Sequence, residues 1–353
     1  MLKKKEILVI KAGGTICQRK NKRGILEIPK DKNGNEVQNY LPLVPEINEI
    51  ANITETELEP IDSTNMTLDY RKKFVEIIRR NYQKQDGFVI IQGTDTLAPS
   101  AVCMNYMVQN LGKPIIFTGA QKSIYEKDTD AIDNVLNSVK VAIENIGETA
   151  IVFDNRIIRG SRSKKRHSKE NYGFYSPNAP LLGKIKKGKV NLENQILRDE
   201  KNFLKSPKIF TDFKKNIFYY QQISGSDTNI LEKVIQDIDS SGIIIGGYGT
   251  GNINSRYLKY IEKAIRMGKP VAITTNCEYG GTEEIYKVGA EAIKLGAFLT
   301  YDMTTIATFQ KMMYSLGVAK SKKVPLKETP EFVKEVMQNP IGEDITKKEL
   351  LFE

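Results

Sequence analysis

The chain has 353 residues, of which 40% are hydrophobic and 27% are charged. This length suits two domains and allows a sizeable core, and the ordinary composition excludes a disordered or low-complexity protein. The first apolar segment, Ile7 to Ile10, follows three lysines but is much too short for a secretory core or a membrane span. We therefore expect a protein that is neither exported nor embedded in a membrane.

The charge and the reactive side chains exclude further classes. The formal net charge is +10, but the basic residues are dispersed, so we expect a lysine-rich surface and no nucleic-acid partner. The three cysteines lie far apart in sequence, which excludes a disulfide framework and a thiolate zinc site and favours a reducing cytoplasm. His167 is the only histidine, so a multi-histidine metal site within one chain is impossible, and a solvent-facing role is the default for this residue.

The first half of the chain alternates short apolar runs with segments of helical periodicity, which indicates parallel βαβ units. Between the first strand and the first helix, residues 19–40 are polar and are expected to form a long loop of the kind that often serves as a lid. The strands are expected at residues 7–10, 58–61, 88–91, 114–117 and 149–153, and the helices at 45–51, 69–83, 100–111 and 131–146. A basic run at residues 155–167 follows the last of these strands and is most simply read as a solvated face.

After residue 183 this alternation weakens, and a second set of units follows. We place an amino-terminal domain at residues 1–190, a linker at 191–212 and a smaller carboxyl-terminal domain at 213–353. In the second domain the strands are expected at 217–220, 242–245 and 271–274, and the helices at 229–238, 255–267, 304–316 and 330–337. The expected fold is a two-domain α/β protein with a mainly parallel sheet flanked by helices in the larger domain.

Three of the expected strands end in hydroxyl-bearing side chains. Thr15 follows the first strand, Ser63 and Thr64 follow the second, and Thr94 and Thr96 follow the third. Open α/β sheets bind ligands at the carboxyl ends of their strands. Each residue taken singly is more simply a helix cap or a turn residue. Three such ends in one sheet nevertheless favour a shared binding site.

Two segments, residues 12–16 and 92–97, resemble the signature segments of the bacterial-type L-asparaginase family. Residues 62–67 resemble the substrate-binding turn of that family, 118–121 its next strand end, and 159–165 the segment with its catalytic lysine. In the second half, residues 248–252 and 302–304 resemble the cytoplasmic, type I branch. The resemblance covers nearly the whole chain.

The resemblance implies an amidohydrolase that converts L-asparagine to L-aspartate and ammonia through a threonine acyl-enzyme, in the cytoplasm and without a metal or organic cofactor. L-Glutamine is a second candidate substrate, and the expected assembly is a homodimer or homotetramer. The implied residues are Thr15, Thr94, Asp95 and Lys165 for catalysis, Asp62, Ser63, Thr64, Thr94, Asp95 and Ala120 for substrate binding, and Asn252, Glu283 and Glu284 for completing a neighbouring protomer's site.

The chain departs from the family pattern at three positions. Ile25 stands where the loop after the first signature usually has a tyrosine, and Tyr40 is a candidate replacement from elsewhere in that segment. Asn65 stands where the substrate-binding turn usually has an aspartate, and Lys164 where a threonine is common. Two alternatives therefore stay open: the amidase component of a tRNA-dependent amidotransferase, and an asparagine-binding sensor without turnover.

Overall fold

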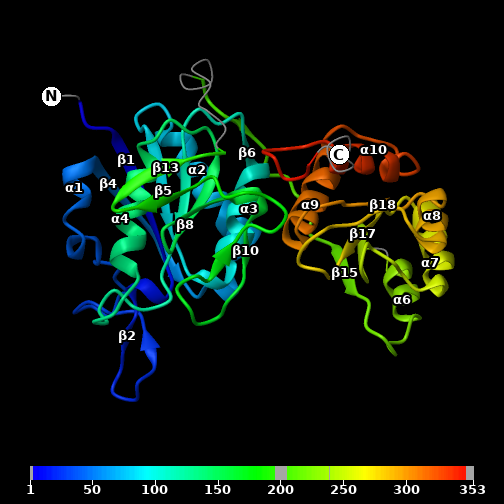
Figure 1. The fold of residues 1–353 in the computed structure, drawn as a ribbon, viewed down its shortest axis with the longest axis horizontal. Coiled ribbons are helices and arrows are strands. Elements are labelled where there is room, and N and C mark those ends of the chain that lie inside the picture. The colour runs from blue at the N-terminus through cyan, green and yellow to red at the C-terminus, as the bar shows by residue number, and fades with distance from the viewer. Residues whose placement is uncertain (1–2, 195–204, 238, 347–353) are drawn as a thin grey trace. The chain divides into compact units, whose positions relative to one another are not determined.

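The protein, described as a computed structural model over residues 3–194, 205–237 and 239–346, separates into two compact units (Figure 1). The units are Met1–Ile209 and Phe210–Glu353. The boundary lies in the stretch 191–212 that the sequence assigned to a linker, of which residues 195–204 lie outside the described residues. No helix among the described residues is long and apolar enough to cross a membrane.

An eight-stranded sheet forms the centre of the amino-terminal unit, in the order β13-β12-β9-β8-β7-β5-β1-β4 over the residues described. The neighbours from β4 to β8 pair in parallel, whereas β9, β12 and β13 add to the sheet antiparallel. The strands are β1 (Glu6–Gly13), β4 (Asn52–Ile61), β5 (Gly87–Ile91), β7 (Ile115–Thr118), β8 (Thr149–Phe153), β9 (Arg156–Arg159), β12 (Gly183–Lys186) and β13 (Lys189–Leu192). The expected two-domain α/β fold with a mainly parallel sheet is confirmed.

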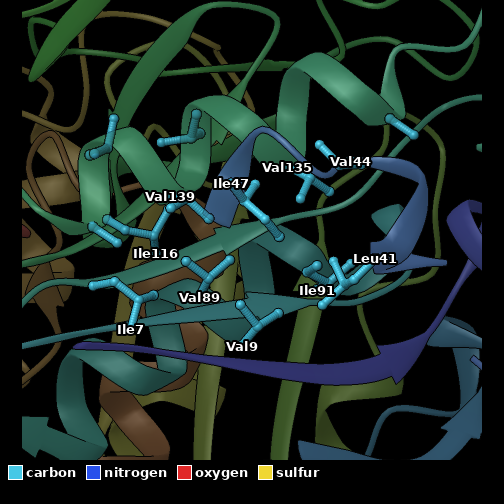
Figure 2. Close-up of a cluster of buried hydrophobic side chains, with 14 of the residues drawn as sticks. Ile7, Val9, Leu41, Val44, Ile47, Val89, Ile91, Ile116, Val135 and Val139 are labelled. Carbon is cyan, nitrogen blue, oxygen red and sulfur yellow. The ribbon is translucent and has the colours of Figure 1, made fainter. Parts of the chain in front are cut away.

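Helices cover both faces of this sheet, which is why its central strands are continuous apolar runs rather than alternating ones. Helices α1 (Ile47–Ile50) and α4 (Ala131–Ala142) lie on one face, where Val135 and Val139 of α4 pack in one cluster with Val9 and Val89 of the strands (Figure 2). Helices α2 (Leu68–Asn81) and α3 (Leu97–Met107) complete the amino-terminal unit, and Phe74 of α2 meets Phe117 of β7 edge to face at 6.4 Å. Every residue of β5 is therefore buried.

Helix α2 begins where its sequence indicates. The Thr67 side chain accepts a hydrogen bond from the Tyr70 amide, as expected of a cap, and the helix starts at Leu68.

Helix α3 differs from its prediction at both ends. It starts at Leu97, three residues before the predicted start, because Pro99 is tolerated in a first helical turn, where the N–H groups make no intrahelical hydrogen bonds. It also ends early, at Met107, because residues 108 and 109 form β6 (Val108–Gln109), which pairs with β14 (Lys208–Ile209).

Two other expectations for the amino-terminal unit are wrong in detail. Strand β4 starts at Asn52 rather than Leu58; it is an edge strand with many exposed side chains, so polar Thr and Glu residues mask its β character. Residues 19–40 are not one structureless loop. Strands β2 (Arg19–Lys20) and β3 (Leu26–Glu27) pair as a hairpin, and the backbones of Lys30 and Glu36 form an isolated antiparallel β-bridge.

The basic run at residues 155–167 is not a uniformly solvated face. The Arg159 side chain is 10% exposed and donates to the Glu148 carboxylate at 2.6 and 3.2 Å, and Arg162 is also buried. Buried charges are found where they are paired, and here the partner comes from the residue preceding β8. The run also includes β10 (Lys164–Lys165), which pairs with β11 (Phe174–Tyr175).

The carboxyl-terminal unit has a four-stranded parallel sheet over its described residues, in the order β15-β16-β17-β18. The helices α6, α7 and α8 share one hydrophobic cluster with this sheet. The elements are β15 (Ile217–Gln221), α6 (Ile230–Gln236), β16 (Gly242–Gly247), α7 (Leu258–Arg266), β17 (Val271–Thr275), α8 (Lys287–Lys294), β18 (Phe298–Leu299), α9 (Thr305–Ser321) and α10 (Thr329–Gln338). The sequence did not predict α8 or β18, and residue 238, the predicted end of α6, lies outside the described residues.

A buried ion pair fixes the end of the described chain to α9. Lys311 donates to the Asp344 carboxylate at 2.8 Å and to the Asn339 carbonyl at 2.6 Å, and both charged side chains are 0% exposed. Removing one partner of a buried pair leaves an uncompensated charge, so Lys311→Met is expected to lower the free energy of unfolding by about 3–5 kcal/mol.

Denaturant unfolding checks this prediction. The matched control is Lys334→Met, which breaks the exposed pair with Glu331 on α10 and should change stability by less than about 1 kcal/mol. Equal losses in the two variants would show that the buried pair does not stabilise the protein more than the exposed one.

Candidate active site

Two glycines make the turn that follows β1. Gly13 and Gly14 have φ angles of 83° and 93°, a region that favours glycine, and Thr15 begins a short 3-10 turn behind them. A Cβ atom added to Gly14 would lie 2.4 Å from the Cα of Gly93, which follows β5. The turn that carries Thr15 therefore touches the turn that carries Thr94, backbone against backbone. Thr15 itself is half-buried.

The turn after β5 brings Thr94 and Asp95 to a lysine from a distant segment. Lys165 Nζ donates to Thr94 Oγ1 at 2.9 Å and to Asp95 Oδ1 at 2.6 Å. The side chains of Lys165 and Asp95 are 22% and 58% exposed, and Thr94 is buried. A hydroxyl, an amine and a carboxylate thus form one hydrogen-bonded group at the rim of the sheet.

The hairpin of β10 and β11 decides which lysine reaches the group. Successive residues of a strand point to opposite faces, so Lys164 and Lys165 cannot both point at Thr94. Lys165 pairs in register with Phe174, and its amine makes both contacts. The hairpin follows a 3-10 turn, Gly160–Arg162, and Gly160 is packed so tightly that an added Cβ would lie 2.9 Å from the Thr149 carbonyl oxygen.

The turn after β4 is hydrogen-bonded to the turn that carries Thr94 and Asp95. The Ser63 hydroxyl accepts a hydrogen bond from the Asp95 amide at 3.2 Å, and the Thr96 hydroxyl donates to the Ser63 carbonyl at 2.8 Å. The Asp62 carboxylate caps this turn by accepting from the Thr64 amide at 3.0 Å. Ser63 is buried, whereas Asp62 and Thr64 are exposed.

The turn after β7 is held by two residues of the α4 region that the sequence did not single out. The Asp130 carboxylate accepts from the amides of Gln121 and Lys122 at 3.0 and 2.9 Å. Asn134 Nδ2 donates to the Gly119 carbonyl at 3.0 Å and also to Asp130. The sequence feature that could have identified the pair is the spacing of four residues between Asp130 and Asn134 at a helix start, which places them next to each other on one helix face. This network fixes the turn that contains Ala120, which is buried.

A cavity of about 720 Å³ lies beside the turn after β4. The segment after Thr15 provides most of its lining, and Pro60 and Asp62 provide the rest: the lining residues are Gln18, Arg19, Lys20, Asn21, Glu27, Ile28, Pro29, Lys30, Glu36, Pro60 and Asp62. The hairpin of β2 and β3 therefore borders the same open space as Pro60 and Asp62. Ile25, in the turn of this hairpin, is 56% exposed.

Tyr40 does not take the place of the missing loop tyrosine. The side chain is 0% exposed and belongs to the core cluster of the sheet, and burial raises the pKa of its hydroxyl well above the ordinary value. A phenol enclosed in this way does not meet a substrate, so the expectation for Tyr40 is wrong.

His167 has a local structural role: its Nδ1 accepts hydrogen bonds from the backbone amides of Lys169 and Glu170 at 3.1 and 3.0 Å.

The three residues expected to complete a neighbouring site lie together in the carboxyl-terminal unit. The backbone N–H of Asn252 closes the turn after β16 by donating to the Tyr248 carbonyl. The backbone N–H of Glu283 donates to the Thr250 carbonyl at 2.9 Å. Glu283 and Glu284 line a cavity of about 430 Å³. The Asn252 Oδ1 atom is buried and has no hydrogen-bond partner among the described residues.

Among the residues that the structure describes, no group of three or more His, Cys, Asp or Glu side chains is arranged to hold a metal ion. The chemistry that the described site offers is that of hydroxyls, an amine and a carboxylate. An amine in contact with a threonine hydroxyl can take up or return its proton, which makes that oxygen a better nucleophile or proton acceptor.

Comparison with known proteins gives matches over both units. The model of the family "Asparaginase, N-terminal" matches residues 6–198, and that of the "Glutaminase/Asparaginase C-terminal domain" matches residues 216–324. L-asparaginase 1 of Escherichia coli is 31% identical over 329 residues, which are 90% of this chain and 93% of that protein. A glutamyl-tRNA(Gln) amidotransferase subunit of Pyrococcus abyssi is 28% identical over 88% of this chain and 72% of that protein. The solved structure of the thermostable L-asparaginase from Thermococcus kodakarensis superposes with a TM-score of 0.83 at 26% identity, over 97% of this chain and all of that one.

Proposed function

This chain belongs to the asparaginase family, and we propose that it hydrolyses the side-chain amide of L-asparagine to L-aspartate and ammonia. The observation that carries the proposal is the contact of Lys165 with Thr94 and Asp95, whose turn packs against the Gly14–Thr15 turn. Amide hydrolysis through a covalent intermediate needs a nucleophilic hydroxyl and a group that accepts its proton. These residues offer both.

In the proposed reaction, Thr15 Oγ1 attacks the amide carbon of the substrate and forms an ester, while the carbon–nitrogen bond breaks and ammonia leaves with the transferred proton. Water then attacks the ester, which releases aspartate and restores the Thr15 hydroxyl. Lys165 in its neutral form takes the proton of Thr94, and Thr94 in turn accepts the proton of the attacking group. Asp95 orients the lysine, as their 2.6 Å contact allows.

The polar ends of the substrate match the turns on either side. We assign the α-carboxylate to the hydroxyl of Ser63 and the backbone of the Asp62–Thr64 turn, and the α-ammonium to the exposed Asp95 carboxylate. The turn at Ala120 would complete the pocket next to Thr94, because an added Cβ at Gly119 would lie 3.6 Å from the Thr94 methyl group. Substrate would then lie across the ends of four neighbouring strands.

We further propose that the active form is a homodimer or homotetramer that works in the cytoplasm. The exposed side chains of Glu283 and Glu284 are accessible to a second copy and support this proposal. The exposed Tyr279 and Tyr286 lie in the same part of the unit and suit a contact surface. The proposed catalytic domain is residues 1–190, and the second domain is residues 213–353.

A second candidate function is the amidase half of a tRNA-dependent amidotransferase, since an amidotransferase subunit of Pyrococcus abyssi is a relative. The purified chain is incubated with L-asparagine or L-glutamine, without tRNA or any partner, and ammonia release is measured. We expect sustained release from L-asparagine, and much slower release from succinamate, which lacks the α-ammonium group assigned to Asp95. Binding of L-asparagine without ammonia would favour a sensor, and release that depends on a partner and tRNA would favour the amidotransferase.

A further inference from the structure

Strands β1 and β4 lose their register just before the Thr15 turn. Lys11 pairs with Glu57, but two residues later Gly13 pairs with Ile61, four residues further along β4. Strand β4 therefore bulges away from β1 over residues 58–60. The backbone groups that face the bulge lose their ladder partners, and buried backbone groups need others. One of the three bulge residues, Pro60, has no N–H to donate.

The Gln38 side chain supplies the missing partners on both strands. Its Oε1 accepts from the Gly13 amide at 2.6 Å, and its Nε2 donates to the Leu58 carbonyl at 2.9 Å. Gln38 thus bridges β1 and β4 at the point where they separate. Tyr70, from α2, donates its hydroxyl to the Glu59 carbonyl of the same bulge.

Gln38 is itself held firmly. It is 1% exposed, and its carbonyl accepts from Lys11 Nζ at 3.0 Å and from the Tyr40 amide at 3.0 Å. Lys11 is in turn buried between Glu55 and Glu57, at 2.8 and 2.5 Å. The amide group of Gln38 therefore occupies a fixed place relative to β1.

The bridge lies two residues from the proposed nucleophile. Gly13 is pressed against Ile61, since an added Cβ would lie 2.7 Å from the Ile61 amide nitrogen, and Gly14 is pressed against Gly93. Without a side-chain acceptor at Gly13, the amide next to this turn would be buried and unpaired. The turn would then shift to find another partner.

We propose that Gln38 is a positioning residue for Thr15: its side chain replaces the ladder bonds at the β4 bulge and thereby fixes the turn from which the Thr15 hydroxyl reaches the substrate. The inference rests on the proposed function of Thr15. Gln38 also lies near the end of the segment of residues 19–40, so it joins the far end of that segment to the turn that carries Thr15.

The test replaces Gln38 by methionine, which keeps the length and loses both hydrogen bonds. A shift of about 1 Å in a reacting group can lower a rate about 10²-fold, so we expect kcat for L-asparagine to fall about 10- to 100-fold. KM should stay near the parent value, because Ser63 and Asp95 are untouched. Hydrogen exchange should become faster in the peptide containing residues 13–17 and stay unchanged in the one containing 63–65.

The matched control is Gln109→Met, which removes a single bond to the Tyr106 carbonyl away from the bulge. Gln38→Glu is a second variant: it keeps an acceptor for the Gly13 amide but places a carboxylate oxygen against the Leu58 carbonyl, so kcat should lie below the parent whether or not the methionine variant folds. If the parent releases ammonia and the Gln38 variants keep its kcat and its exchange at residues 13–17, the inference is wrong. If the parent itself releases none, the proposed function fails, and the exchange measurement alone decides whether Gln38 holds the turn.

Discussion

Replacing Thr15 by alanine is expected to lower kcat for L-asparagine by about 10³-fold or more. Without its nucleophile a hydrolase keeps only the rate enhancement that comes from substrate binding and from electrostatic stabilisation of the transition state. The variant should fold, because Thr15 lies half-buried at the mouth of the site and is not part of the sheet core. Thr15→Ser, which keeps the hydroxyl, should retain measurable turnover. Ammonia release under substrate saturation, with circular dichroism for folding, checks the prediction.

The matched control is Thr67→Ala, in the same unit. Thr67 caps α2 and lies outside the hydrogen-bonded group of the site, so its loss should reduce stability by about 1 kcal/mol and leave kcat nearly unchanged. A Thr15→Ala variant with more than a tenth of the parent kcat would exclude Thr15 as the nucleophile.

The second substitution that is expected to lower kcat strongly is that of Lys165. Methionine has a similar length but cannot accept or return a proton, so Lys165→Met should lower kcat by about 10²- to 10⁴-fold. The neighbouring Lys164→Met provides the control, because the Lys165 amine makes the contacts to Thr94 and Asp95, and alternate residues of a strand face opposite sides. The control should stay within a few fold of the parent, as measured by ammonia release over a range of pH.

The pH series adds a result that a folding defect would not give. If Lys165 exchanges a proton during turnover, Lys165→Met and Lys164→Met should differ in the pH dependence of kcat, because only the first variant loses the amine that contacts Thr94. Equal kcat values and pH profiles in the Lys164 and Lys165 variants would reject the assigned role of Lys165.

The central strands of both units were predictable because each is a short apolar run bounded by glycine or polar residues. β5 and β7 are buried on both faces, so hardly any polar residue interrupts their pattern. Strand β4 was predicted only from Leu58, because an edge strand carries polar side chains that hide the signal. The end of α3 depends on pairing with residues 208 and 209, about a hundred positions away, which no local pattern encodes.

The site was predictable only in part. Hydroxyls at the ends of β1, β4 and β5 follow from the order of strands and turns alone. The contact between Lys165 and Thr94 spans 71 positions and was expected from the family resemblance, not from the pattern of residues. Gln38 and Asp130 escaped notice because a polar residue in a loop carries no sign of the backbone amide that it will hold.

Burial of charge was the least predictable feature. Arg159 lies in a strongly basic run, and such runs are usually solvated, yet its guanidinium meets Glu148 inside the unit. The partner lies eleven positions earlier and is recognised only when β8 and β9 are known to pair antiparallel. Periodicity therefore identifies the elements here, whereas the pairing of the elements decides which polar side chains enter the interior.

The most direct measurement is to mix the enzyme with excess L-asparagine, quench with acid within milliseconds, and locate any covalent adduct by peptide mass spectrometry. An aspartyl ester on the peptide that contains Thr15, present during turnover and lost after the substrate is consumed, is the expected result. An adduct on the Thr94 peptide instead, or a first turnover of ammonia with no adduct on either peptide, would contradict the proposed acyl-enzyme on Thr15.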